Sequence, residues 1–254
     1  PLLPEDMDAL IIAAPTQAFQ DHEIKAIEQY LNQGGSLMLA LDDRRATGLE
    51  KITGHVGLQL EKFYVFNVFN SPMGQVVNSQ AATVAAQYSQ ASEITKMFTA
   101  SQMTVFRQPH ALTVTNTPAT IHVESIVKTP ENSVALKELD SADYQGKPQP
   151  FNLAIELKGK YAATAEKDFS MVVFADTDFM SNILLYQNLN RDLALNTVAS
   201  LAKEIDLISV SPKEAQATKI LLSPPEFNQF FTFAIFGLFL PLPLLLLITS
   251  SVLW

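Results

Sequence analysis

The sequence contains no cysteine among its 254 residues. Disulfides, thiolate metal sites, iron–sulfur clusters and thiol nucleophiles are therefore all excluded. Histidine is also scarce, and the few that occur lie in unrelated segments without the spacing of a metal site. They are His22, His55, His110 and His122. On this inventory of residues we expect no bound metal and no cofactor.

Charged residues are few as well, because they make up 17% of the chain. Lys and Arg together number 17 against 26 Asp and Glu, which gives a formal net charge of −9. An acidic chain repels phosphate backbones, so nucleic-acid binding is not expected. Hydrophobic residues reach 48%, which is too many for an intrinsically disordered chain. The composition indicates a folded protein with apolar surface to bury beyond an ordinary core.

Common motifs for nucleotides and nucleophiles are missing. The sequence has no G-x-G-x-x-G fingerprint, no P-loop and no G-x-S-x-G nucleophile elbow. ATP hydrolysis by a P-loop and dehydrogenase activity on a nucleotide fingerprint are thereby excluded. We expect this chain not to be an enzyme.

A charge-free apolar stretch runs from Phe227 to Trp254. Its 28 residues would measure roughly 42 Å as a helix, against about 30 Å for the hydrocarbon core of a bilayer. Prolines in its middle favour a kink that a neighbouring helix would accommodate, and tryptophan is enriched at membrane interfaces. We predict a transmembrane helix over 227–254, whose marker residues are Phe230, Phe233, Phe236, Pro241, Pro243 and Trp254.

The first forty residues predict a βαβ unit. Residues 9–14 (ALIIAA) form a short apolar run of the kind found in fully buried strands. A helix is predicted over 21–32, because its apolar residues share one face and Gly34 follows as a left-handed cap. A second buried strand is predicted over 36–41. The two strands of such a unit are parallel.

The same pattern returns near the end of the soluble part, where 171–175 (MVVFA) predicts a buried strand and 191–203 predicts a helix. Residues 129–150, with three prolines, are predicted to be a surface loop. Weaker patterns predict helices over 50–55 and 93–100 and strands over 63–69, 112–115, 121–126 and 151–157. The fold class is therefore predicted to be α/β, with a mostly parallel sheet flanked by helices.

The chain begins at Pro1 without an initiator methionine or a signal-peptide pattern, so we expect a fragment of a longer protein. We expect an α/β domain over 1–211, with a less regular insert at about 63–150. A proline-containing linker over 212–226 would then join this domain to the transmembrane helix.

Polar residues follow two of the predicted strands. Ligands of open parallel sheets bind beyond the carboxyl ends of the strands. Acidic side chains there can converge on a divalent cation such as Mg²⁺, or they can cap turns and helices by accepting hydrogen bonds from backbone N–H groups. Both readings are open from the sequence. The residues concerned are Asp42, Asp43 and Arg44 after 36–41, and Asp176 and Asp178 after 171–175.

A second polar patch precedes the last predicted helix. Asn190 and Arg191 are candidates for facing a ligand or a partner. Their position just before a helix is explained equally well by helix capping.

The order of several segments resembles the GldG-type family of auxiliary subunits of ABC transport systems, which are linked by name to gliding motility. The resemblance spans about Asp8 to Trp254, and it is carried by QYLNQGGSLMLALDD, MVVFADTDFMSN and NRDLALNTVASLAKEIDLISVSPKE, followed by the apolar terminus. It implies an amidotransferase-like or flavodoxin-like α/β layout, held outside the cytoplasm by membrane helices beside an ABC permease. Amidotransferase chemistry needs a cysteine that this chain lacks, so no catalytic residue is transferred.

Together these features predict a non-enzymatic auxiliary subunit anchored in the bacterial inner membrane, with its soluble domain on the periplasmic side. It would bind a substrate, an envelope component or a partner, while a separate ATPase subunit supplies energy to the ABC permease. Two alternatives remain open at this point. One is a metal-dependent hydrolase that uses the strand-end aspartates, and the other is a purely structural tether.

Overall fold

The computed structural model describes residues 3–4, 6–42, 47–71, 74–78, 81–139, 144, 146–204, 232 and 235. The chain divides into two units, Pro1–Ser211 and Pro212–Trp254, and the first holds nearly all of these residues. Among the residues so described, no helix has both the length and the apolar character needed to cross a bilayer. The predicted linker and, apart from residues 232 and 235, the predicted membrane segment lie outside them, including Phe230, Phe233, Phe236, Pro241, Pro243 and Trp254.

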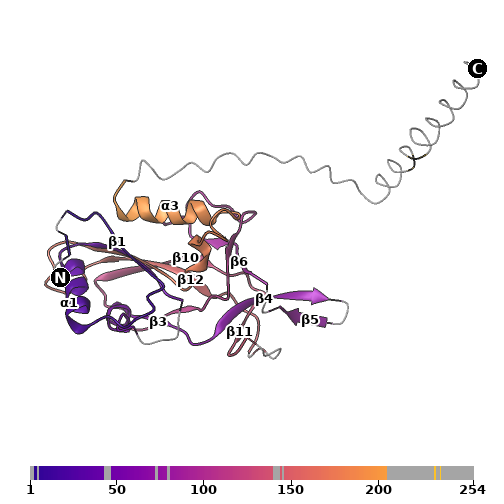
Figure 1. Cartoon of the computed structure of the whole chain (residues 1–254), viewed down its shortest axis with the longest axis horizontal. Coiled ribbons are helices and arrows are strands. Elements are labelled where there is room, and N and C mark those ends of the chain that lie inside the picture. The colour runs from indigo at the N-terminus through magenta and orange to yellow at the C-terminus, as the bar shows by residue number, and fades with distance from the viewer. Residues whose placement is uncertain are drawn as a thin grey trace, which may run out of the picture. The chain divides into compact units, whose positions relative to one another are not determined.

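The predicted βαβ unit is present in the first unit of the chain. Strand β1 (Leu10–Ala13) and strand β2 (Ser36–Ala40) are parallel and are connected through helix α1 (Asp21–Asn32). Gly34 follows the helix with a φ of 86°, as expected for a left-handed cap. Strand β13 (Phe169–Phe174) pairs with the other side of β2, also in parallel. Figure 1 labels β1 and α1 of this unit.

The rest of the main sheet is antiparallel, so the prediction of a mostly parallel sheet is wrong. Its order is β1-β2-β13-β12-β10-β7, and each strand after β13 runs antiparallel to its neighbour. These strands are β12 (Asn152–Gly159), β10 (Ile121–Lys128) and β7 (Gln87–Tyr88). Residues 160–168 join β12 to β13 without a crossover helix, and neighbouring strands joined in this way must be antiparallel. The fold is therefore a mixed, sheet-rich α/β fold.

Two hydrophobic cores cover the two faces of this sheet. Leu37 and Leu39 of β2 point to one face, where they pack in a cluster with residues of α1 and of α2 (Glu50–His55). Met38, between them in the sequence, points to the other face, where the cluster includes Leu193 of α3 (Asn190–Leu201). Because both faces are covered, β2 is buried along its whole length.

Smaller sheets complete the unit. Strand β4 (Tyr64–Ser71) lies between β11 (Ser133–Leu136) and β5 (Gly74–Val77) in a three-stranded antiparallel sheet. Strands β6 (Thr83–Ala85) and β8 (Thr104–Phe106) form a two-stranded sheet, and β3 (Leu58–Leu60) joins the main sheet through β9 (Leu112–Val114).

Three further predictions need correction. Residues 93–100 form turns and no helix: Ile94 and Phe98 are buried at helical spacing, but the segment supports only short-range bonds such as that from the Phe98 N–H to the Thr95 carbonyl. The predicted loop 129–150 contains β11. Strand β1 is not fully buried, because it lies at the edge of the sheet and leaves Ile11 49% exposed.

Candidate functional site at the strand ends

The carboxyl ends of β2 and β13 lie side by side, which brings together the aspartates that follow them. Asp176 is fully buried directly after β13. Its Oδ1 accepts a hydrogen bond from the Asp178 N–H at 3.0 Å, and its Oδ2 accepts one from the Arg107 N–H at 3.0 Å. The side chain therefore closes the turn after β13 and joins it to the chain leaving β8. Of the two roles that the sequence left open for this aspartate, metal binding and the capping of a turn, these contacts correspond to capping.

Burial perturbs the ionisation of the two carboxyls at this edge. It raises the pKa of Asp176 to about 7, even though the two N–H donors oppose the rise, and the charges of Asp42 and Asp178 add to it. Burial also raises the pKa of Asp42, and the charge of Asp178 adds to that shift. Contacts with Thr177 and the charge of His110 act in the opposite direction. Asp176 thus gains or loses its proton around neutral pH.

His110 belongs to this cluster, although nothing in the sequence pattern placed it there. The backbone N–H of His110 donates a hydrogen bond to the Ala175 carbonyl at 3.0 Å, which places the residue next to the end of β13. The ring is buried, with Nδ1 2.8 Å from the Phe63 carbonyl oxygen and its centroid 4.7 Å from that of Tyr64. His110 and Asp42 come from segments 68 residues apart in the sequence, so only the sheet topology brings them together.

The cluster does not form a metal site from the residues that can be described. In that part of the chain, no group of three or more His, Asp and Glu is arranged to hold a metal ion. Asp43 and Arg44 lie outside the described residues. Both oxygens of the Asp176 side chain already accept hydrogen bonds from backbone donors.

The second predicted patch separates into a buried and an exposed residue. Asn190 is fully buried, and its Oδ1 accepts a hydrogen bond from the Val105 N–H at 2.8 Å. Its Nδ2 lies 2.8 Å from the Val105 carbonyl, 3.1 Å from that of Phe179 and 3.0 Å from that of Leu184. Asn190 therefore joins α3 to β8 and to the preceding turn, and it faces no ligand. Arg191 beside it is exposed.

A cleft opens next to Asp42, beyond the end of β2. Its volume is about 350 Å³, and its walls come from the end of β2, from α2 and from the region of β3. Glu50 at its rim is already engaged, because its carboxylate accepts hydrogen bonds from the N–H groups of Thr47 and Gly48 at 2.9 and 2.7 Å. The other polar residues that line it include Asp42, Gln59, Lys62 and Thr115, and the apolar ones include Leu41, Leu58 and Leu60.

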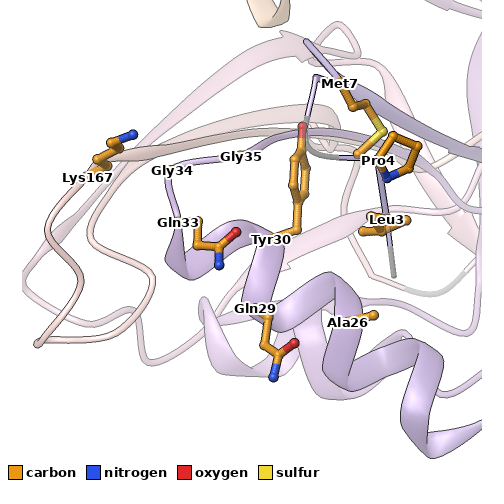
Figure 2. Close-up of a pocket in the computed structure, with 10 residues that line it drawn as sticks. All are labelled: Leu3, Pro4, Met7, Ala26, Gln29, Tyr30, Gln33, Gly34, Gly35 and Lys167. Carbon is orange, nitrogen blue, oxygen red and sulfur yellow. The ribbon is translucent and has the colours of Figure 1, made fainter. Parts of the chain in front are cut away.

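A larger pocket lies at the opposite, amino end of β2. It has a volume of about 610 Å³ and is lined by α1, by Gly34 and Gly35, by Lys167 and by the segment that precedes β1 (Figure 2). Tyr30 stands in this pocket, and its hydroxyl accepts from the Ser36 N–H at 3.0 Å and donates to the Ser36 carbonyl at 3.1 Å. None of the predicted site residues that the structure describes lines it. Asp42 lines the smaller cleft, which we take as the candidate site.

Comparison with known families identifies the chain. The family model described as "ABC-type uncharacterized transport system", for its auxiliary component, matches residues 1–209. The chain belongs to this family. The match is consistent with a GldG-type auxiliary subunit and confirms the resemblance seen in the sequence. The family thus describes this protein as an auxiliary component of an ABC-type transport system.

Among solved structures, one described as "mmIFT52 N-terminal domain" has a similar fold. The TM-score is 0.55, the sequences are 12% identical, and the alignment covers 76% of each chain. At this identity the likeness concerns the fold alone. No curated protein matches the sequence.

Proposed function

We propose that this chain is a non-enzymatic, membrane-anchored auxiliary subunit of an ABC transporter, with its α/β domain outside the cytoplasm. The family match over residues 1–209 carries this proposal. The absence of nucleotide motifs from the sequence supports it, and so does the charge-free apolar stretch 227–254. In this scheme an ABC permease is the partner in the membrane, and a separate ATPase subunit hydrolyses ATP.

The anchoring and the side of the membrane can be tested by labelling, because the chain has no cysteine of its own. The variant Ala100→Cys places a single cysteine at an exposed position, and its labelling reports on which side of the membrane the domain lies. We expect a membrane-impermeant maleimide to label it in spheroplasts of the bacterial host, with the protein in the membrane fraction. Labelling only after cell lysis would contradict a periplasmic domain, and recovery of the full chain in the soluble fraction would contradict the anchor.

We further propose that the cleft beside Asp42 is where the domain binds a substrate, an envelope component or a partner chain. The cleft combines apolar walls with a few polar groups, as small-ligand sites commonly do, and it lies at the sheet edge where α/β folds place their ligands. Only one basic residue, Lys62, is among the described residues that line it. Neutral or cationic groups therefore suit this cleft better than polyanions.

A blocking variant follows from the shape of the cleft. Gly54 lines it from α2, and a side chain added there meets no atom within 4 Å. Gly54→Leu should fill the cleft while leaving the helix intact. Ala18→Leu adds the same side chain at an exposed loop position and serves as the matched control.

Two readouts separate the outcomes: co-purification of the permease and ATPase chains with the full-length protein in detergent, and transport activity in cells. If the cleft binds a partner chain, Gly54→Leu lowers both. If it binds a substrate or an envelope component, only transport falls. If both stay at the level of Ala18→Leu, the cleft is not a binding site.

A structural tether is the second candidate, and the placement of Asp176 and Asn190 favours it. Both side chains are fully buried and are engaged by backbone groups of the domain itself. A tether predicts that Gly54→Leu is silent and that substitutions of these two residues act only through the stability of the domain.

A further inference from the structure

One long segment of this acidic chain carries no charge at all. From Phe63 to Ser92 the sequence has 30 residues without Asp, Glu, Lys or Arg. At the chain's average of 17% charged residues, about five would be expected in a segment of this length. The strands β4 and β5 lie inside it, and β11, their neighbour in the sheet, is also free of charge. A complete three-stranded sheet is thus built from uncharged residues.

Strand β5 is an unprotected edge of this sheet. Among the described strands it pairs with β4 alone, and its four residues match those of β4 in continuous register without a bulge. Natural proteins protect such edges with charged residues, prolines, bulges or a covering element. The sequence of β5, Gly-Gln-Val-Val, contains neither a charge nor a proline. In the part of the chain that the structure describes, no strand pairs with the outer side of β5.

The same hairpin exposes apolar side chains. Phe69 of β4 and Val76 of β5 are direct cross-strand partners, and they are 47% and 45% exposed. The adjacent pair, Val68 and Val77, packs in the small core on the other face of the sheet. Figure 1 shows β4 and β5 extending away from the part of the unit that contains α1. An apolar pair is therefore presented beside a free strand edge.

We infer that β5 pairs with the β5 of a second copy of this chain, antiparallel about a two-fold axis. The residue on such an axis lies opposite its own counterpart and its immediate neighbours lie close to theirs, so a charge at any of these positions would be near a charge of the same sign. A surface for a different partner would gain from complementary charges, whereas a self-pairing strand as short as β5 gains from having no charge near its axis.

The pairing would join two three-stranded sheets into one of six strands. When Val76 is placed opposite its counterpart, the side chains of both copies lie on one face, because directly paired residues point to the same side. Phe69 lies on that same face as the cross-strand partner of Val76. The four side chains then form a continuous apolar strip across the axis. This inference does not depend on the cleft or on its ligand.

Disulfide cross-linking of the full chain in detergent tests the pairing directly, because no native cysteine competes. We expect Val76→Cys to form a disulfide-linked dimer under mild oxidation, since paired residues at such an axis have Cβ atoms about 5 Å apart. Val114→Cys is the matched control: it is also a valine in a strand, 40% exposed, but lies in β9. Equal cross-linking of the two variants would overturn the inference.

Charge substitutions give a second, independent measurement by sedimentation of the full chain. Val76→Lys and Val76→Glu should each weaken self-association up to about fivefold, because two like charges then meet at the axis. An equimolar mixture of the two variants should restore dimers, as the charges become complementary. Circular dichroism checks that both variants are folded. A wild-type chain that stays monomeric, or a mixture that does not recover, would refute self-pairing through β5.

Discussion

Replacing Asp176 by asparagine should change the pH dependence of stability in a defined way. At pH 5 the variant should be less stable than the wild type. An amide has only one oxygen, so its NH₂ group would face one of the two N–H donors, from Arg107 and Asp178, that the carboxyl now satisfies. Leaving one buried donor without an acceptor costs about 1–3 kcal/mol.

The difference should shrink, and then reverse, as the pH rises. The pKa of Asp176 is about 7 in the folded chain against an ordinary value of 3.8, so the folded state binds the proton more tightly. Stability from this group is fully present below pH 3.8 and is lost as the pH rises towards and through 7. Between pH 5 and pH 8 the wild type should lose about 3 kcal/mol relative to the variant, which has no proton to lose there.

Thermal unfolding of the full chain in mild detergent, followed by circular dichroism at pH 5 and pH 8, measures this difference. For a domain of this size, about 3 kcal/mol corresponds to a change of roughly 6–12 °C in the gap between the two melting temperatures. Arg191→Ala, an exposed change nearby in the chain, should show no such dependence. A gap that is constant from pH 5 to pH 8 would refute the assignment of a raised pKa to Asp176.

Four further substitutions test the roles of individual side chains and glycines in the stability of the unit. Asn190→Leu should destabilise the unit by about 2–4 kcal/mol, because the Val105 N–H and the carbonyls it now binds lose their partner, and urea unfolding would measure this. Gly35→Ala should destabilise by roughly 1–3 kcal/mol, since its Cβ would lie 2.5 Å from the Tyr30 ring, whereas Gly54→Ala should stabilise α2 by up to about 1 kcal/mol. If both glycine variants melt at the same temperature, the packing at Gly35 is misjudged. Tyr30→Phe should cost about 1 kcal/mol through the lost bonds to the Ser36 backbone, and unchanged urea unfolding would contradict it.

The sequence predicts the local elements well where apolar runs are long and bounded. The first strand, helix and second strand lie within one residue of their predicted bounds, because buried runs such as SLMLA and a helix followed by glycine are strong local signals. Sheet direction is not local information. The residues of β12 give no indication that this strand pairs antiparallel with β13, which follows it in the sequence. This pairing makes the sheet mixed.

The candidate site shows the same division. The rule that ligands lie beyond parallel strand ends correctly selected Asp42 and Asp176 as neighbours, since β2 and β13 are indeed adjacent and parallel. The rule could not foresee that Asp176 and Asn190 are buried and bound to the backbone, because burial depends on residues more than 60 positions away, such as Arg107 and Val105. His110 was missed for the same reason.

The position of β2 between β1 and β13 has a consequence for how the polypeptide acquires its structure. Ser36 pairs with Ser170, a separation of 134 residues, so the centre of the sheet cannot be assembled until the last strand has left the ribosome. Until then Leu37 and Leu39 lack the strand that flanks them on one side. This apolar segment is therefore exposed during most of the synthesis of the chain and is prone to aggregate, which is the situation in which chaperones bind nascent chains.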